Sequence, residues 1–372
     1  MQYQNVCLEA LAYALPEEIV TSGELEARLA PAYSRLRLPE GRLELMTGVA
    51  QRRFWPEGTL PSQPSTLTAA EALRLAGVEP SHVGALVHGS VCRDVLEPAT
   101  ACKVHRQLGL PRACLVYDVS NACLGLMDGI LQVANMIELG QIRAGVVVGT
   151  ESSRTLVDNT IRRLNEDASL TRADVKLAVA SLTIGSGSAA VVLVDRRISR
   201  TGNRLLGGVA WTRSDSSHLC QSGPDSSIGG ELPLIRTDSE ALMHAGIEAA
   251  TETFDRFLDV MAWQRDDVDK TFCHQVGKTH RRMLFEALGL DVAIDYSTLP
   301  LLGNTGSVAL PITAAMGIEQ GHLRQGDMVA LMGIGSGVNV VILAVDWQRS
   351  PVDAHGPRSL PQAACGLAER TA

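Results

Sequence analysis

The sequence predicts an α/β fold with largely parallel strands, and three observations support this class. Short runs rich in Val, Ile and Ala alternate with helical patterns along the chain. Apolar residues make up 45% of the 372 residues and aromatic residues only 4%, which suits buried strands covered by helices. A repeated order of motifs indicates, in addition, that the chain consists of two related halves.

The apolar runs place candidate strands in both halves. In the first half they are Val83 to Val91, Ala113 to Val119, Ala144 to Val148 and Ala189 to Val194. In the second half they are Lys270 to Val276, Val292 to Tyr296, Met328 to Met332 and Val338 to Val345. Because helical segments separate them, we expect mostly parallel pairing.

Two pairs of matching segments suggest that one unit is used twice. A helix ending in Leu-Gly-Leu, a strand and a loop that opens a new helix follow one another from Lys103, and again from Thr279. The segments IGSGSAAVVLV, from Ile184, and IGSGVNVVILAV, from Ile334, match as well. Chance similarity of apolar strands is the alternative, but two matches in the same order favour duplication.

The duplication divides the chain into an N-terminal half, residues 1–200, and a C-terminal half, residues 201–348. The first half is longer, and its extra residues fit 151–182, which is either a surface insert or a cap over a substrate channel. Residues 212–232 are rich in Ser, Gly and Asp and predict a loop between the halves. Residues 349–372 lose periodicity and predict a flexible tail.

Charge and cysteine usage limit the classes of partner. The net charge of −8 argues against nucleic acid as the main partner. The N-terminus lacks a signal-peptide pattern, and no apolar run reaches the roughly 20 residues of a membrane span. The 8 cysteines form no CxxC pair and no cluster with His at metal spacing. We therefore expect a cytoplasmic protein with reduced thiols and no metal.

The first candidate for chemistry is Cys123, in the segment DVSNACLGLMDGI. A β-run ends there, and Ser-Asn-Ala-Cys leads into a helix with Gly125 in its first turn. Unpaired amides and the helix dipole at such a position favour a thiolate, and Gly125 is expected to leave room for substrate. A buried structural cysteine is the alternative interpretation.

His274 and Asn304 are the candidate partners of this cysteine. His274 ends an apolar run, so it can point from a rigid strand end into a cleft, although a hydrogen-bonded structural histidine is the ordinary alternative. Asn304 lies at the mouth of a helix, where an Asn usually caps the helix or makes a turn. It occupies the position in the second half that Cys123 occupies in the first. A pseudo-twofold arrangement would therefore bring both helix mouths to one cleft.

These residue types can together carry out acyl transfer and condensation. Cys123 would attack a thioester and hold the acyl group. His274 and Asn304 would bind the thioester oxygen of a second substrate and stabilise its enolate. The oxyanion of the acyl-enzyme would be held by backbone amides, for which Cys123 and Ser336, in the Gly-rich loop MGIGSGVN, are the candidates.

The sequence resembles the ketoacyl synthase III branch of the thiolase superfamily from about residue 1 to Trp347. The matching motifs are Asn-Ala-Cys-Leu-Gly, His-Gln-Val-Gly, Gly-Asn-Thr-Gly and the C-terminal Gly-rich loop. The resemblance implies a five-layered αβαβα thiolase-like fold, an obligate homodimer and a Cys-His-Asn triad. It also implies coenzyme A thioesters as substrates, with no tightly bound cofactor.

Within that branch, SVCRDVLEPATA and LMGIGSGVN make the chain most similar to the head-to-head acyl-CoA condensing enzymes of bacterial olefin biosynthesis (OleA). This resemblance implies that Glu97 reaches across the dimer and serves as the base for the α-proton. A surface carboxylate is the alternative. Met46 stands where many malonyl-using synthases have an arginine that grips coenzyme A. Arg52 and Arg53 remain as candidate phosphate contacts.

The presence of Glu97 favours one reaction over the others. A decarboxylating synthase needs no strong base, whereas a non-decarboxylating Claisen enzyme must remove a weakly acidic α-proton. We therefore expect two acyl-CoA molecules to be joined into a 2-alkyl-3-oxoacyl product. The alternatives are a decarboxylating 3-oxoacyl synthase III that uses an acyl carrier protein, a pyrone-forming ketosynthase, a thioester-to-alcohol acyltransferase and a non-catalytic partner subunit.

Overall fold

The two halves of the chain form sheets with the same order of strands. The computed structural model describes residues 1–222 and 235–350. The first sheet has the order β5-β4-β6-β7-β1 and the second the order β12-β11-β13-β14-β8, so each position in one corresponds to a position in the other. A single residue pair, Cys7 with Arg204, joins them into one ten-stranded sheet. This correspondence confirms the duplication.

The strands of the first sheet are β1 (Val6–Ala14), β4 (Ala85–Gly89), β5 (Leu115–Val119), β6 (Ala144–Glu151) and β7 (Gly187–Asp195). Those of the second are β8 (Arg204–Thr212), β11 (Lys270–Cys273), β12 (Asp295–Tyr296), β13 (Met328–Gly335) and β14 (Asn339–Asp346). Two small sheets pair β2 (Glu18–Thr21) with β3 (Gln51–Phe54) and β9 (Cys220–Ser222) with β10 (Ile235–Thr237).

The expectation of largely parallel strands is wrong for the middle of the sheet. Strand β4 pairs in parallel with β5 and β6, and β11 with β12 and β13. The pairs β6–β7, β7–β1, β13–β14 and β14–β8 are antiparallel. For β13 and β14 the reason is the connection, Ser336 to Val338, which is too short for the crossover that parallel neighbours need.

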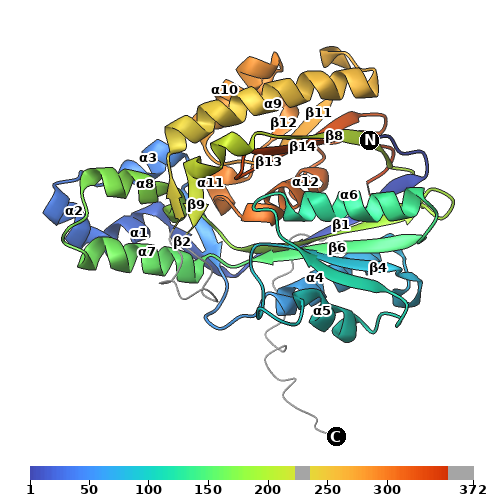
Figure 1. Ribbon diagram of the computed structural model, residues 1–372, viewed down its shortest axis with the longest axis horizontal. Helices are drawn as coiled ribbons and strands as arrows, with labels where there is room; N and C mark the ends of the chain where they lie inside the picture. The colour runs from blue at the N-terminus through green and yellow to red at the C-terminus, as the bar shows by residue number, and fades with distance from the viewer. Residues whose placement is uncertain (223–234, 351–372) are drawn as a thin grey trace, which may run out of the picture.

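Helices cover both outer faces and also fill the space between the two sheets (Figure 1). Helices α4 (Ser62–Ala76) and α5 (Thr100–Leu108) cover the first sheet, and α9 (Ser239–Met261) and α10 (Lys278–Leu288) cover the second. The central helices are α6 (Gly125–Glu138) and α12 (Ala309–Glu319). Almost every residue of α12 is buried, as expected for a helix that is apolar on all sides. The result is the five-layered αβαβα arrangement.

Five further helices form a lobe with an apolar core of its own. They are α1 (Ser22–Arg28), α2 (Ala30–Leu36), α3 (Arg42–Thr47), α7 (Arg154–Glu166) and α8 (Arg172–Leu182). Leu25 of α1 and Leu29, the residue after α1, pack with Val157 and Ile161 of α7 in this core. The predicted insert, 151–182, supplies α7 and α8, whereas the contribution of residues 22–47 was not predicted.

Several other predicted elements differ from the structure in length or position. Val292 to Tyr296 was expected to be a strand, but a 3₁₀ turn (Val292–Ile294) leaves only the two residues of β12. Strands β1 and β8, at the junction of the halves, were not expected. In the loop predicted at 212–232, residues up to 222 form a 3₁₀ turn (Ser214–Leu219) and β9, while the rest lies outside the described residues. The predicted tail also lies outside them from residue 351 onwards.

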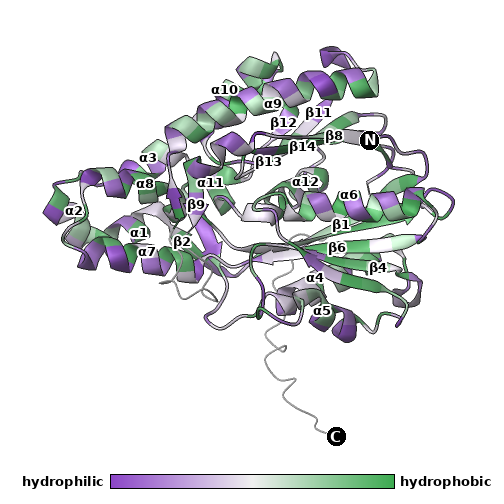
Figure 2. Cartoon of the chain, in the orientation of Figure 1, coloured by the Kyte–Doolittle hydropathy of each residue, from purple (hydrophilic) through white to green (hydrophobic). Residues whose placement is uncertain are grey.

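Hydropathy follows these layers. Figure 2 shows green concentrated on the strands, with purple alternating with green along the outer helices. The largest core lies between the sheets and unites Leu124, the N-cap of α6, and Met127 of α6 with Ile312 of α12 and Leu331 of β13. In the described part of the chain, no helix is long and apolar enough to cross a membrane.

Candidate active site

Cys123 lies in the turn that joins the end of β5 to the start of α6, as the sequence predicts. The residue before it, Ala122, has a left-handed φ of 44°, which is unusual for a residue other than glycine and costs about 1 kcal/mol or more. The turn is held by hydrogen bonds from the Leu124 amide to the Asn121 carbonyl (2.8 Å) and from the Asn121 side chain to Asp128 (2.7 Å). A strained turn that is fixed in this way holds the thiol at the mouth of the helix.

Gly125 has a different role from the one expected. A Cβ at this position would lie 3.1 Å from the Val119 carbonyl oxygen and 3.2 Å from the Ser90 nitrogen. At Gly89 a Cβ would lie 2.5 Å from the Gly125 oxygen. The two glycines therefore allow the start of α6 to press against the end of β4, which places Cys123 relative to the sheet. The space that Gly125 leaves is filled by protein, and not by substrate.

Burial dominates the electrostatics of the nucleophile. It raises the pKa of Cys123 to about 12, and the nearby Glu151 and Cys220 add to the rise. The expectation that the helix dipole yields a resting thiolate is therefore not met, because burial and adjacent negative charge outweigh it. The resting enzyme holds a thiol, and attack on a thioester needs a group that accepts its proton.

His274 follows directly on β11, and its backbone amide donates to the carbonyl of Met332 (2.9 Å). The side chain is buried, and neither ring nitrogen has a hydrogen-bond partner among the described residues. Burial, together with the neighbouring His280, lowers the pKa of His274 to about 4, so the imidazole is neutral at neutral pH. Two unpartnered buried nitrogens are costly unless a ligand supplies the partner. This position therefore suits a ligand atom that donates or accepts a hydrogen bond.

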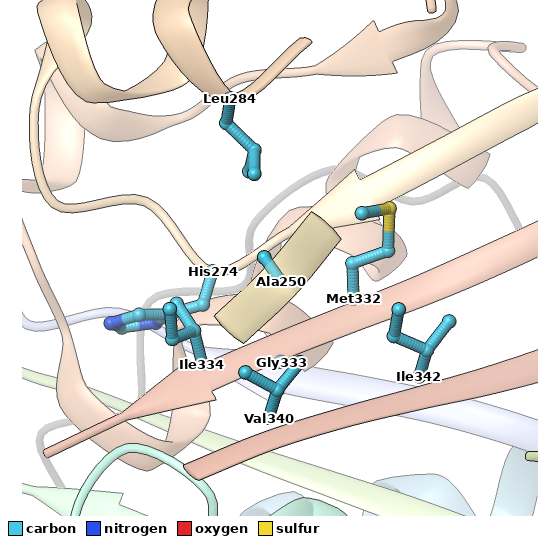
Figure 3. Close-up of a pocket in the computed structure, with 8 residues that line it drawn as sticks. All are labelled: Ala250, His274, Leu284, Met332, Gly333, Ile334, Val340 and Ile342. Carbon is cyan, nitrogen blue, oxygen red and sulfur yellow. The ribbon is translucent and has the colours of Figure 1, made fainter. Parts of the chain in front are cut away.

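A small cavity adjoins His274 on the side of α9 and α10. Its other lining residues are apolar: Ala250, Leu284, Met332, Gly333, Ile334, Val340 and Ile342 (Figure 3). The cavity has room for about one water molecule. The cavity is therefore too small to hold an acyl chain in this conformation.

Asn304 lies between α11 (Leu299–Leu302) and α12, at the mouth of the second central helix. Its amide donates to the Thr183 carbonyl and its carbonyl accepts from the Gly185 amide, both at 2.9 Å. Its side-chain oxygen accepts from the Gly306 amide at 2.9 Å, as the capping interpretation expects. That bond uses the side-chain oxygen, and the NH₂ group is a donor that can also serve a ligand.

The Gly-rich loop after β13 is tied to the nucleophile turn. A Cβ on Gly335 would lie 3.5 Å from the Cys123 nitrogen. The Asn339 side chain donates both to the Ser336 carbonyl and to the side-chain oxygen of Asn121, each at 3.2 Å. The backbone of Ser336 is therefore near that of Cys123, as two shared oxyanion donors require. Cys220, which the sequence did not single out, accepts from the Ser336 hydroxyl at 3.3 Å.

The remaining candidates are Glu97, Arg52 and Arg53. Glu97 is exposed in the loop after β4. Arg52 is fully buried, donates to the carbonyls of Val20 and Leu182, and has a pKa that burial lowers to about 10. Arg53 is partly buried and donates to the Pro16 carbonyl (2.8 Å). These contacts correct the expectation of phosphate-binding arginines, because both guanidinium groups bind the protein's own backbone.

The fold and this cluster define a thiolase-fold condensing enzyme. Family models agree: residues 61–181 match the thiolase N-terminal domain, and residues 258–347 match the C-terminal domain of 3-oxoacyl-[acyl-carrier-protein] synthase III.

Proteins of similar sequence indicate which family of thiolase-fold condensing enzymes this chain resembles. An acyl-CoA:acyl-CoA alkyltransferase of Shewanella oneidensis is 42% identical over 352 residues, which cover 93% of this chain and all (100%) of the relative. One of Xanthomonas campestris is 33% identical with the same coverage of both chains. A ketoacyl synthase III of Pseudomonas aeruginosa is 28% identical over 90% of this chain and 94% of its own. The chain belongs to the acyl-CoA:acyl-CoA alkyltransferase family.

Solved structures of OleA from Xanthomonas campestris superpose closely. One, a variant with a glutamate replaced by alanine, has a TM-score of 0.88 at 32% identity and covers 93% of this chain and 99% of its own. Another, a cysteine-to-serine variant with bound lauric acid and lauroyl-CoA, has a TM-score of 0.87 at 32% identity, with coverage of 93% and 100%.

Proposed function

We propose that this protein joins two acyl-CoA thioesters by a head-to-head Claisen condensation without decarboxylation. The observation that carries the proposal is that one strand, β13, contacts both candidate residues: Gly335 lies beside the Cys123 nitrogen, and the Met332 carbonyl accepts from the amide of the unpartnered, neutral His274. Membership of the acyl-CoA:acyl-CoA alkyltransferase family supports the choice of substrates. The lauroyl-CoA bound to a related OleA supports acyl chains of this length class.

The reaction runs in two half-reactions. Cys123 loses its proton to a neighbouring base, for which neutral His274 is the candidate, and attacks the first acyl-CoA, so that coenzyme A leaves as its thiol. A base then removes the α-proton of the second acyl-CoA, and His274 and Asn304 stabilise the enolate oxygen. The enolate carbon attacks the acyl-enzyme carbonyl, with the oxyanion held by the amides of Cys123 and Ser336. Cleavage of the carbon–sulfur bond releases the 2-alkyl-3-oxoacyl product and the thiolate.

A second copy of the chain is expected to supply Glu97 as the base for the α-proton. Apolar side chains on the same loop, Val91, Val95 and Leu96, are exposed in the single chain, as is Leu115 on the edge strand β5. An unpaired strand edge beside exposed apolar residues favours association with another chain. We therefore propose a homodimer across this face, in the cytoplasm, where coenzyme A thioesters and reduced thiols occur together.

The test is the mass of the product formed from lauroyl-CoA alone. The proposed function predicts a product built from two lauroyl units, with release of free coenzyme A and without carbon dioxide. A product that appears only after a malonyl thioester is added would bring the decarboxylating synthase forward. Delivery of lauroyl groups as acyl carrier protein thioesters, compared with coenzyme A thioesters, would identify the preferred donor.

A further inference from the structure

Glu151 is a buried carboxylate beside the nucleophile that the reaction described above does not use. It is the last residue of β6 and is 6% exposed. Four donors converge on it: the amides of Val91 (3.2 Å) and Cys92 (3.4 Å), and the amide (3.3 Å) and hydroxyl (2.5 Å) of Ser307. A carboxylate with so many donors is a built part of the structure.

The donors come from two segments that carry candidate site residues. Val91 and Cys92 belong to the loop that follows β4 and continues to Glu97. Ser307 belongs to the turn that follows Asn304 and opens α12, and its hydroxyl also donates to the Gly89 carbonyl (2.9 Å). One carboxylate therefore links the first half of the molecule to the second at the point where both reach the cleft.

The same contacts argue against a role for Glu151 as the base. The hydrogen bonds occupy the lone pairs of the carboxylate that a base would use. Its charge nevertheless acts on the nucleophile: after burial, Glu151 is the larger of the two neighbouring charges that raise the pKa of Cys123. The residue therefore contacts the groups around the reaction without touching the reacting atoms.

We propose that Glu151 is a positioning residue, which fixes the Val91–Cys92 loop and the Gly306–Ser307 turn against each other and places its carboxylate beside the Cys123 thiol. The proposed positioning of the loop and the turn rests on the proposed condensation, because these segments carry residues assigned to that reaction. The effect on the thiol does not depend on which reaction follows.

The test compares two variants with a matched control. Glu151→Gln removes the charge, and its NH₂ group must face at least one amide donor. Glu151→Asp keeps the charge but shortens the side chain by one methylene group. Glu9→Gln is the control, because Glu9 is also buried and accepts from a hydroxyl and an amide (Ser199 and Arg200), on the remote strand β1. The measurements are condensation of lauroyl-CoA, and the rate of iodoacetamide alkylation of the Cys123 peptide, followed by mass spectrometry between pH 7 and 10.

Both Glu151 variants should condense about 10- to 100-fold more slowly than the wild type, since displacement by about 1 Å has such an effect. Only Glu151→Gln should also speed alkylation of Cys123 at a given pH, by about threefold or more, which corresponds to half a pKa unit. Glu9→Gln should change neither rate.

The electrostatic role would be overturned if Glu151→Gln were alkylated at the wild-type rate. It would also be overturned if Glu151→Asp were alkylated as fast as Glu151→Gln. Normal condensation by both variants would overturn the positioning role. If the wild type does not condense lauroyl-CoA, the proposed function fails, and alkylation still tests Glu151.

Discussion

At Cys123 the physical conditions for reactivity and for stability oppose each other. Burial gives the thiol a defined place in a strained turn, but it also raises the pKa of Cys123 to about 12. Only a neighbouring proton acceptor resolves this conflict. His274 fits the requirement because its imidazole is neutral and its nitrogens are unpartnered among the described residues. In the proposed reaction, acylation requires Cys123 to lose its proton, and His274 is the candidate acceptor.

Replacement of Cys123 should abolish the acyl-enzyme. After incubation with lauroyl-CoA, the intact mass of the wild type should increase by one lauroyl group, while Cys123→Ala should show no such adduct. Cys92→Ala and Cys273→Ala are the controls, and both should still be acylated, because neither thiol lies at the start of a central helix. An adduct on Cys123→Ala would assign the nucleophile elsewhere.

The His274 and Asn304 variants should separate the two half-reactions. Asn304→Ala should still form the acyl-enzyme and should condense about 100-fold more slowly or worse, since one donor to the enolate oxygen is lost. His274→Ala should condense as poorly and should also acylate more slowly, because it loses the proton acceptor as well. Burst measurements of coenzyme A release, set beside product formation, give both rates. Product formation at the wild-type rate by either variant would contradict its assigned role.

Local sequence was sufficient to place Cys123, His274 and Asn304 in the fold, because each lies at the end of a strand or at the start of a helix and the surrounding motif indicates that position. It was not sufficient for Glu151, whose partners Val91 and Ser307 lie 60 and 156 residues away. The local sequence was misleading for Arg52, because the charge of an arginine alone suggests an exposed side chain. Burial of a guanidinium against carbonyl groups depends on how the lobe packs, and short motifs do not report that packing.

At the scale of elements, the duplicated order of strands was accessible because buried strands of parallel β-α-β units are nearly continuous apolar runs. Strands β1 and β8 were missed at the junction of the halves, where β1 includes the buried Glu9 and β8 includes Gly207 and Gly208. A charged residue and two adjacent glycines weaken the apolar pattern. The close contact between the end of β4 and the start of α6 could not be predicted either, because it depends on two glycines that are far apart in the sequence.

Gly89→Ala should disturb the helix that carries the nucleophile. The new Cβ would lie 2.5 Å from the Gly125 oxygen and 2.7 Å from the Leu126 Cα, which are backbone atoms with little freedom to move. We expect a destabilisation of about 1–3 kcal/mol and slower acylation of Cys123. Gly23→Ala in α1 is the matched control: its Cβ has only a 3.9 Å contact, and it should be neutral or stabilising by about 0.5–1 kcal/mol. Urea unfolding and acylation rates check both; equal behaviour of the two variants would contradict the packing argument.

At the scale of the whole molecule, the two halves place their candidate site residues at corresponding positions. Central helices α6 and α12 bring the turns of Cys123 and Asn304 into one layer between the sheets, and Glu151 links the loops beside them. Glu97 is the exception, since it is exposed on a loop with apolar neighbours. The single chain contains the residues that we assign to acylation, whereas the proposed base for the α-proton lies on an exposed loop, where the proposed second copy would meet it.

Mixed dimers test whether that base acts across the interface. Glu97→Gln should still be acylated at Cys123 but should form carbon–carbon bonds very slowly, because it keeps the shape of the side chain and loses its basic oxygen. Cys123→Ala should be inactive as well. When the two inactive proteins exchange subunits, each mixed dimer contains one site with an intact Cys123 from one chain and an intact Glu97 from the other, and a second site that lacks both.

Activity per mixed dimer should therefore rise toward half that of the wild type if Glu97 acts in trans. If it acts within its own chain, every site in the mixture lacks one of the two residues, and no activity should return. Subunit exchange is verified by differently tagged chains purified in tandem. Full activity of Glu97→Gln alone would remove the base from the mechanism. Since decarboxylation can generate a carbanion without a base, that result would favour a malonyl-using reaction at the same cysteine.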